Sequence, residues 1–393
     1  MINPNKYDCC GCFACLQSCP KQCISKSTDK EGFDYPIVDE KVCVDCGLCE
    51  KVCPIINVSG KKQPLKVLAA KNKDKQIVAK SSSGGVFFSI ARKVIEQGGV
   101  VFGARFDENW MVIHDYTDTL SGLSPFMTSK YVQSSIGDTY SKAKKFLNDG
   151  RIVLFTGTPC QIAGLHSFLR KYYDNLITVD FLCHGVPSPL VWRKYLEREL
   201  DYIEKDISSI QNINFRDKSD GWKYFRLSIH FSVPKNNNSE NLELSSPHKE
   251  NKFMKGFLND LYLRPSCHKC RFKRFQSKSD ITIADFWAIS KVDPAFYEPD
   301  GVSMIFVNTI LGDSYIDSNN FNIIETRFED TLSNKGLHEC TPEHLKRDYF
   351  FENFENTSDI TKIIDKCVDP PVYKRMGLKS KNLLKRIWRK LGI

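Results

Sequence analysis

Two copies of one cysteine pattern near the N-terminus constrain this chain most. One copy runs from Cys9 to Pro20 and the other from Cys43 to Pro54, and each reads C-x2-C-x2-C-x3-C-P. Three closely spaced thiolates can surround one face of an iron–sulfur cubane, and in this pattern the fourth cysteine reaches the other cluster. The repeat therefore predicts two 4Fe–4S clusters, one held by Cys9, Cys12, Cys15 and Cys53 and the other by Cys19, Cys43, Cys46 and Cys49.

A zinc ribbon is the alternative, because paired C-x2-C motifs also suit tetrahedral zinc. Zinc has no use for a third regularly spaced cysteine or for the proline that follows each run, so iron–sulfur binding is favoured. The chain has 16 cysteines. Its polar N-terminus lacks the apolar core of a signal peptide, and no apolar stretch approaches the ~18 residues of a membrane span. A cytoplasmic chain is therefore expected, in which disulfides are rare. Cys10 and Cys23 are left over and are expected to be small buried residues.

The pattern changes after residues 59–66, which are polar, contain Gly and Pro, and are typical of an interdomain linker. Strand-like and helix-like segments then alternate, which indicates an α/β domain with a partly parallel sheet. The expected fold is thus an α+β ferredoxin-type module over residues 1–60, an α/β domain over 66–345 and a helical segment over 346–393. The predicted strands are 66–71, 99–105, 110–116, 151–155 and 176–182. The predicted helices are 86–97 and 136–148, followed by one that ends at 172 and one that ends at 200.

Two strand-to-helix junctions carry small or hydroxylated residues. They are Ser81–Gly85 and Thr156–Thr158. Helix N-termini present free N–H groups and the positive end of the helix dipole, so both loops are candidate anion cradles. Plain N-capping by Ser or Thr is the simpler interpretation of either loop taken singly.

A third set of cysteines lies in the predicted α/β domain. Cys267 and Cys270 form another C-x2-C, and Cys160 and Cys183 each follow a predicted strand. Loops at one sheet edge converge, so these four thiols could hold a third cluster. The alternatives are inert buried thiols, a zinc site completed by His184 or His268, or a Cys160–His184 catalytic pair. Cys340 and Cys367 have no partners at metal-ligand spacing and are expected to be structural.

Several motifs in order resemble the family of beta subunits of coenzyme F-420 hydrogenases and dehydrogenases. The similarity runs from about Lys66 to Asn308, and an N-terminal ferredoxin module is a frequent companion in that family. The segments that carry it are Ser81–Val86, Gly157–Leu165, Cys183–Pro189, Arg264–Cys267 and Ser279–Trp287.

This resemblance implies an FAD-containing oxidoreductase in which the flavin lies beside a third 4Fe–4S cluster. Cys160, Cys183, Cys267 and Cys270 are similar to that cluster's ligands, and the two hydroxyl-rich loops become candidates for the flavin pyrophosphate. The implied flavin contacts are Ser82, Ser83, Gly84, Gly85, Thr156, Gly157, Thr158 and Gln161. The catalytic candidates are His184, Lys218 and Asp285, with Asp217 and Trp222 as further neighbours.

The chemistry implied is electron transfer between clusters and, through FAD, a deazaflavin or another organic redox substrate, with a protein partner such as ferredoxin. Two alternatives remain: a non-catalytic electron-relay subunit, and a ferredoxin-dependent reductase in bacterial polysaccharide metabolism. The net charge of +9 is concentrated in residues 374–390, so a nucleic-acid partner is not expected. This basic amphipathic tail could contact an anionic membrane surface peripherally, or pack its apolar side on the body.

Overall fold

The computed structural model describes residue 2 and residues 5–57, 63–235, 238–357 and 359–369. The predicted linker falls partly outside these residues, and the predicted basic tail lies entirely outside them. Within the described part of the chain, none of the helices combines the length and apolar character that crossing a membrane requires.

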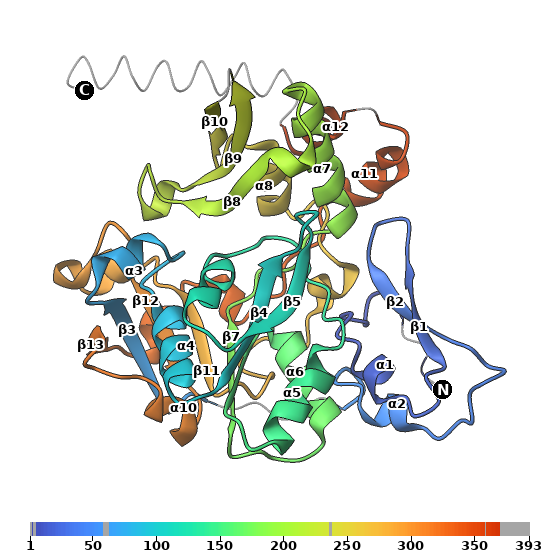
Figure 1. Ribbon diagram of the computed structural model, residues 1–393, viewed down its shortest axis with the longest axis vertical. Coiled ribbons are helices and arrows are strands. Elements are labelled where there is room, and N and C mark those ends of the chain that lie inside the picture. The colour runs from blue at the N-terminus through green and yellow to red at the C-terminus, as the bar shows by residue number, and fades with distance from the viewer. Residues whose placement is uncertain (1, 3–4, 58–62, 236–237, 358, 370–393) are drawn as a thin grey trace.

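The N-terminal module contains two short helices and one hairpin (Figure 1). Helices α1(Ala14–Ser18) and α2(Leu48–Lys51) each begin inside a cysteine run, directly after a residue with positive φ. Strands β1(Ile24–Thr28) and β2(Asp34–Val38) pair antiparallel. The apolar core of this module is small, and much of it consists of cysteine side chains. Folding of this segment therefore depends on more than hydrophobic burial.

The centre of the molecule is an eight-stranded mixed sheet in the order β13-β3-β12-β11-β7-β6-β4-β5. Neighbouring pairs β4–β6, β6–β7 and β7–β11 are parallel, and the remaining pairs are antiparallel. The predicted partly parallel α/β sheet is confirmed. The strands are β3(Lys66–Asn72), β4(Val100–Phe106), β5(Val112–Thr117), β6(Val153–Thr156), β7(Leu176–Phe181), β11(Ile281–Asp285), β12(Ser303–Val307) and β13(Phe321–Glu325).

Helices cover both faces of this sheet because successive strand residues point to opposite sides. Val101 and Leu154 belong to the core under α4(Val86–Glu96), whereas Phe102 and Phe155 belong to the core under α5 and α6. The smaller helices at the sheet are α3(Lys75–Ala79), α9(Ile289–Val292) and α10(Ile310–Ser314), and the second face carries α5(Thr139–Asn148) and α6(Pro159–Leu169). Helix α5 begins three residues later than predicted, because Gly137 has a φ of 57°.

A second layer lies above the sheet in Figure 1 and packs around one large apolar core. It holds the three-stranded antiparallel sheet β10-β9-β8 together with helices from both the middle and the end of the described chain. The C-terminal helices therefore share a core with the middle of the chain. The elements are β8(Ile210–Asp217), β9(Arg226–Lys235), β10(Asn238–Pro247), α7(Pro189–Tyr202), α8(Lys252–Leu258), α11(Arg347–Phe354) and α12(Ile360–Val368).

Candidate functional site

Four cysteines of the repeated pattern, together with Cys10, line one cavity, called here the inner cavity. The four are Cys9, Cys12, Cys15 and Cys53, so the last cysteine of the second run joins the first three of the first run. Burial raises the pKa of the Cys15 thiol to about 12, and the nearby Cys9 and Cys53 thiols add to the effect. Thiols this close cannot all ionise without a cation, and a metal cluster supplies that positive charge.

The other four motif cysteines line a second cavity, called here the outer cavity. Its lining includes Cys19, Cys43, Cys46 and Cys49. Cys23 also lines this cavity, with its Sγ atom 3.4 Å from the Sγ of Cys19. Gly47 has a φ of 69° immediately before α2, which lets the backbone turn tightly between Cys46 and Cys49. Each cavity thus contains one set of the crossed arrangement that the spacing predicts.

The third set of cysteines also lines a single cavity, called here the third cavity. Cys160 lies at the start of α6, Cys183 follows β7, and Cys267 and Cys270 belong to the segment around the 3-10 turn η4(Pro265–Lys269). Burial raises the pKa of Cys267 to about 12 and that of Cys270 to about 11, and each neighbouring thiol adds to the shift. Four convergent thiols are a donor set that suits an iron–sulfur cluster.

The histidines proposed as zinc ligands have other partners. His184 lines the third cavity, but its Nε2 lies 2.6 Å from Asp260 Oδ1. His268 Nδ1 lies 3.0 Å from the carbonyl oxygen of Thr341. Cys340, which was expected to be structural, is exposed and its Sγ approaches the carbonyl oxygen of Cys270 at 3.3 Å.

The inner and third cavities share part of their lining. Cys10 lies in the shared wall, where the neighbouring Cys12 thiol raises the pKa of Cys10 well above its ordinary value and Cys160 opposes that shift. The sequence predicts correctly that Cys10 is buried, but not that it lies between two cysteine sets. The only sequence signal was its position directly beside Cys9. The shared lining is Asp8, Cys10, Ile55 and Arg271.

The loop before α4 contains a buried hydroxyl without a partner. Ser81 Oγ donates to the carbonyl oxygen of Ile77, and Ser82 Oγ accepts from the backbone and side chain of Ser129. Ser83 Oγ has no hydrogen-bond partner among the described residues, although it is buried. An unpaired buried polar group is costly, so this atom is suited to a bound polar ligand.

The loop before α6 serves the helix itself. Thr158 and Gln161 form a capping box, and the Gln161 side chain also donates to Ser134 Oγ at 2.9 Å. His114 Nε2 lies 3.0 Å from the carbonyl oxygen of Thr156, and burial lowers the pKa of His114 to about 4. N-capping thus accounts for the contacts between Thr158 and Gln161, and flavin contacts by Thr156, Gly157, Thr158 and Gln161 stay predictions.

A buried arginine forms the polar centre at the carboxyl end of β11. Arg216 makes two 3.1 Å bonds to the Asp285 carboxylate and donates to the carbonyl oxygen of Ser82 at 3.0 Å. Trp222 Nε1 donates to the same carboxylate at 2.7 Å, and its ring stacks on Trp287 at 4.6 Å between centroids. Arg216 Nε has no partner among the described residues. Arg216 was not predicted from the sequence, because a single arginine in a strand has no motif.

The two remaining catalytic candidates differ in their surroundings. Lys218 Nζ donates to the carbonyl oxygens of Val78 and Asp300 at 2.6 and 2.7 Å, and burial lowers its pKa to about 8. Asp285 is held by Arg216 and Trp222. Asp217 belongs to another group, in which its carboxylate and the ligand atoms of His230 and Glu243 lie within 4.8 Å of one another. His184 lies at the third cavity instead.

Comparisons with known proteins match two parts of the chain. Residues 150–330 match the family model for the C terminus of the beta subunit of coenzyme F420 hydrogenase/dehydrogenase, and residues 8–56 match that for a 4Fe-4S dicluster domain. The chain is 22% identical over 340 residues to the F subunit of the F(420)H(2) dehydrogenase of Methanosarcina mazei, which covers 79% of this chain and 81% of that protein.

Shorter or weaker similarities accompany these matches. A stretch of 42 residues is 45% identical to a 7Fe ferredoxin of Hydrogenibacillus schlegelii and covers 11% of this chain and 47% of the ferredoxin. A chain of the xenon-derivatized F420-reducing NiFe hydrogenase complex from Methanosarcina barkeri has a TM-score of 0.47 and 16% identity, covering 76% of this chain and 95% of that chain. Binding of 4Fe–4S clusters is supported by the ferredoxin-type match together with the cysteine-rich N-terminus.

Proposed function

We propose, from its similarity to the family of coenzyme F-420 hydrogenase/dehydrogenase beta subunits, that the chain is an iron–sulfur flavoprotein oxidoreductase of that family. In this proposal the inner, outer and third cavities each hold one 4Fe–4S cluster. The observation that carries it is the grouping of twelve cysteines into three cavities, two of which share a wall. Clusters carry single electrons and a flavin exchanges one or two, so together they supply the chemistry for reducing or oxidising an organic substrate.

FAD is proposed near the loop 81–85 and the Arg216 cluster. Buried Ser83 Oγ and Arg216 Nε both lack partners among the described residues, and both can donate to phosphate or flavin oxygens. The bidentate pair with Asp285 fixes the orientation of the Arg216 guanidinium, so the Nε–H without a partner among the described residues points in one fixed direction. A deazaflavin is the proposed substrate class, and a protein that delivers or accepts single electrons, such as ferredoxin, is the proposed partner.

An electron-relay subunit is the second candidate function, favoured by the name of one relative, which is a dehydrogenase subunit. A relay needs the clusters but not the flavin. Bound flavin therefore discriminates between the two functions.

The first test is to purify the chain without oxygen and to measure iron, acid-labile sulfide and released flavin. The expected result is about twelve irons and one FAD per chain, the content of three clusters and one flavin site. About eight irons without flavin, even after reconstitution, would reduce the function to electron relay through the N-terminal module.

A variant separates flavin binding from cluster binding. Ser83→Leu fills the space at the unpaired hydroxyl and is expected to lower flavin content at least about fivefold while iron stays unchanged. Ser124→Leu on an exposed turn is the matched control, with wild-type flavin content. Full flavin occupancy in Ser83→Leu would exclude this loop as the flavin site.

A further inference from the structure

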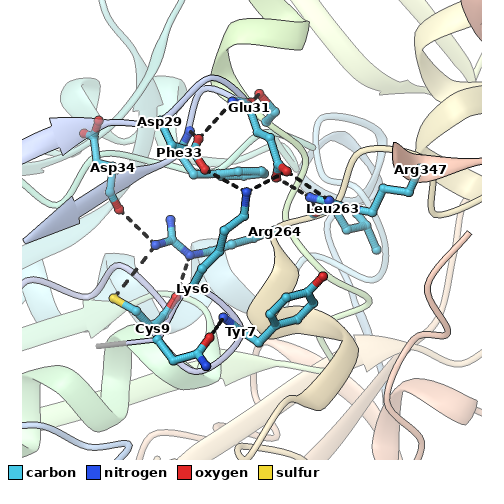
Figure 2. Close-up of polar contacts among 12 residues, drawn as sticks. Lys6, Tyr7, Cys9, Asp29, Glu31, Phe33, Asp34, Leu263, Arg264 and Arg347 are labelled. Atoms are coloured by element: carbon cyan, nitrogen blue, oxygen red, sulfur yellow. Dashed lines mark hydrogen bonds and ion pairs between the residues drawn. The ribbon is translucent and has the colours of Figure 1, made fainter. Parts of the chain in front are cut away.

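Arg264 is a buried cation that lines the third cavity and contacts the first cysteine loop (Figure 2). It is 1% exposed and follows directly after Leu263, which forms a bridge with Pro187. Its Nε donates to the carbonyl oxygen of Cys9 at 2.8 Å, and one Nη donates to the carbonyl oxygen of Asp34 at 2.9 Å. The same Nη lies 3.9 Å from the Sγ of Cys9. The side chain thus fixes the first cysteine loop from outside the N-terminal module.

The guanidinium also contacts the backbone of that loop closely. A Cβ atom at Gly11 would lie 2.8 Å from an Arg264 Nη, and Gly11 has a φ of 69°. Gln133 Oε1 accepts from Arg264 at 3.0 Å, while Gln133 Nε2 donates to the carbonyl oxygen of Cys10 at 3.2 Å. Arg264 and Gln133 together hold the loop of residues 9–11 at the wall between the inner and third cavities.

Arg264 differs from two other buried arginines in having no carboxylate partner. Arg347 pairs with Glu31 at 2.5 Å, and Arg216 pairs with Asp285 at 3.1 Å. Arg264 makes no ion pair with any carboxylate of the described residues; its acceptors are carbonyl oxygens, one amide and a cysteine sulfur. The Tyr35 ring, 4.4 Å from the guanidinium carbon, offsets part of the charge. Burying an unpaired charge is strongly unfavourable, so an anionic partner is expected.

The nearest candidate for that anion is the thiolate set of the inner cavity. A 4Fe–4S cluster with four thiolate ligands is anionic, and adding one electron makes it more so. A buried cation beside it stabilises the reduced form, and the low surrounding polarity strengthens the effect. The charge of Arg264 also favours the thiolate forms of Cys160 and Cys267 in the third cavity, but it is the Cys9 sulfur that the guanidinium contacts.

Other charged side chains at these cavities are less suited to stabilise the reduced inner cluster. Asp8 and Arg271 line the inner cavity, but their side chains are 40% and 48% exposed and pair with each other at 3.2 Å. Glu50 also lines the inner cavity, and Lys21 and Asp45 line the outer cavity. Arg264 is instead fully buried, and its guanidinium contacts the sulfur of a predicted ligand.

We propose that Arg264 sets the reduction potential of the inner cluster and keeps it above that of the outer cluster. Electrons entering the module then collect at the inner cluster, which shares its wall with the third cavity. One electron from the reductant enters the cluster and no proton accompanies it, because the guanidinium already carries its charge. This inference rests on the proposed cluster at the inner cavity, and it assigns Arg264 a role toward the first cysteine loop that the spacing of the motifs does not indicate.

The test is a dithionite titration followed by electron paramagnetic resonance on the whole chain and on Arg264→Gln and Arg264→Lys. Cys46→Ser, which alters an exposed outer ligand, identifies the outer-cluster signal. In Arg264→Gln the equilibrium constant for reduction of the inner cluster is expected to fall at least about tenfold, which lowers its reduction potential by about 59 mV for one electron. Arg264→Lys keeps the charge and is expected to stay within about threefold of wild type, and the outer signal is expected to stay unchanged in both.

Each other outcome contradicts one statement only. A shift below about threefold in Arg264→Gln, or an equal shift of both signals, would overturn the role of Arg264. If Arg264→Gln assembles no inner cluster, the two reduction potentials of the wild-type chain are compared instead. A wild-type inner potential below the outer potential contradicts the inference. A wild-type chain without an inner-cluster signal would instead contradict the proposed function.

Discussion

At the scale of single residues, Glu31 and Arg347 connect the N-terminal module to the C-terminal helices. Arg347 is 2% exposed, its Nη2 lies 2.5 Å from Glu31 Oε2, and the same nitrogen donates to the carbonyl oxygen of Leu263 at 3.1 Å. Lys6 adds a second cation 2.6 Å from Glu31 Oε1 (Figure 2). A buried pair of this kind fixes geometry, and removing one member leaves the other charge uncompensated.

The change Glu31→Gln is therefore expected to destabilise the chain by about 3 kcal/mol. Burial alone would raise the pKa of Glu31, but Arg347 and Lys6 outweigh it and hold the pKa below its ordinary value of 4.5. The contribution of the pair is thus complete above that value and is lost as pH falls through the lower folded-state pKa. Urea unfolding at about pH 7 and at pH values below 4.5 measures both effects.

Two controls accompany this prediction. The double change Glu31→Gln with Arg347→Met is expected to cost less than the two single changes summed, because neither charge is left unpaired. Arg327→Gln, which removes an exposed ion pair with Asp330, is expected to leave stability nearly unchanged. Equal unfolding midpoints for Glu31→Gln and wild type would show that the pair contributes nothing.

Residue-scale prediction from the sequence succeeded where a motif exists and failed where tertiary structure decides. The repeated spacing predicted that Cys53 shares a cavity with the first three cysteines of the other run, and the structure shows this grouping, while cluster binding by these cysteines stays a prediction. Arg216 and Arg347 carry no local signal, and Arg264 lies in a quoted motif that does not reveal its contacts, because the partners of all three lie far away in the chain. For Glu31 and Arg347 that separation is 316 residues.

At the scale of elements, helix α6 joins the central sheet to the N-terminal module. Its first turn carries Cys160 of the third cavity, and Gly164 one turn later lies against Cys12. A Cβ atom at Gly164 would lie 2.8 Å from the Cβ of Cys12 and 2.8 Å from the hydroxyl of Tyr140. The absence of a side chain at this position therefore allows the two cysteine sets to approach each other.

The change Gly164→Ala is expected to push Cys12 away from its position. Overpacking of this kind costs about 1–3 kcal/mol, and here it also displaces a predicted inner ligand. Iron per chain is expected to fall by about four atoms, with loss of the inner-cluster resonance signal. Ser167→Ala on the same helix is the control and keeps its iron. Full iron content in Gly164→Ala would show that the space between residue 164 and Cys12 accommodates a methyl group without displacing Cys12.

Element-scale prediction succeeded for the alternating strands and helices between residues 66 and 202. Buried strands followed by helices have clear periodicity, and the observed bounds lie within a few residues of the predicted ones. The sequence could not reveal that β12 inserts antiparallel between β3 and β11, because strand order depends on contacts across the whole sheet. The three-stranded sheet β10-β9-β8 was not predicted either, for the same reason.

At the scale of the whole molecule, the inner cavity shares lining residues with the third cavity, whereas, of the residues that the structure describes, the outer cavity shares none with it. The N-terminal module has only a two-stranded sheet among its described residues and a small core in which cysteine predominates. Modules of this size need a metal or another covalent link for stability. The central sheet, by contrast, has large apolar cores on both faces.

Iron removal is therefore expected to unfold the module while the central sheet stays folded. With a strong chelator under reducing conditions, amide exchange in residues 8–56 is expected to accelerate at least about tenfold. The amides of β6 and β7 are the internal control and keep their protection. Unchanged exchange in residues 8–56 after complete iron loss would show that the module folds without metal.

One short segment, residues 263–273, touches both the N-terminal module and the third cavity. It supplies Arg264 to the first cysteine loop, Cys267 and Cys270 to the third cavity, and a lysine whose Nζ donates to the carbonyl oxygen of Cys183 at 2.6 Å. For the evolution of such chains, this means that an N-terminal module cannot be exchanged freely between relatives. A recombinant would have a working junction only if the incoming module placed its carbonyl groups to accept from Arg264 and its Glu31 equivalent to pair with Arg347. Insertion of one residue into segment 263–273 would disturb the contacts that this segment makes with the module and with the third cavity.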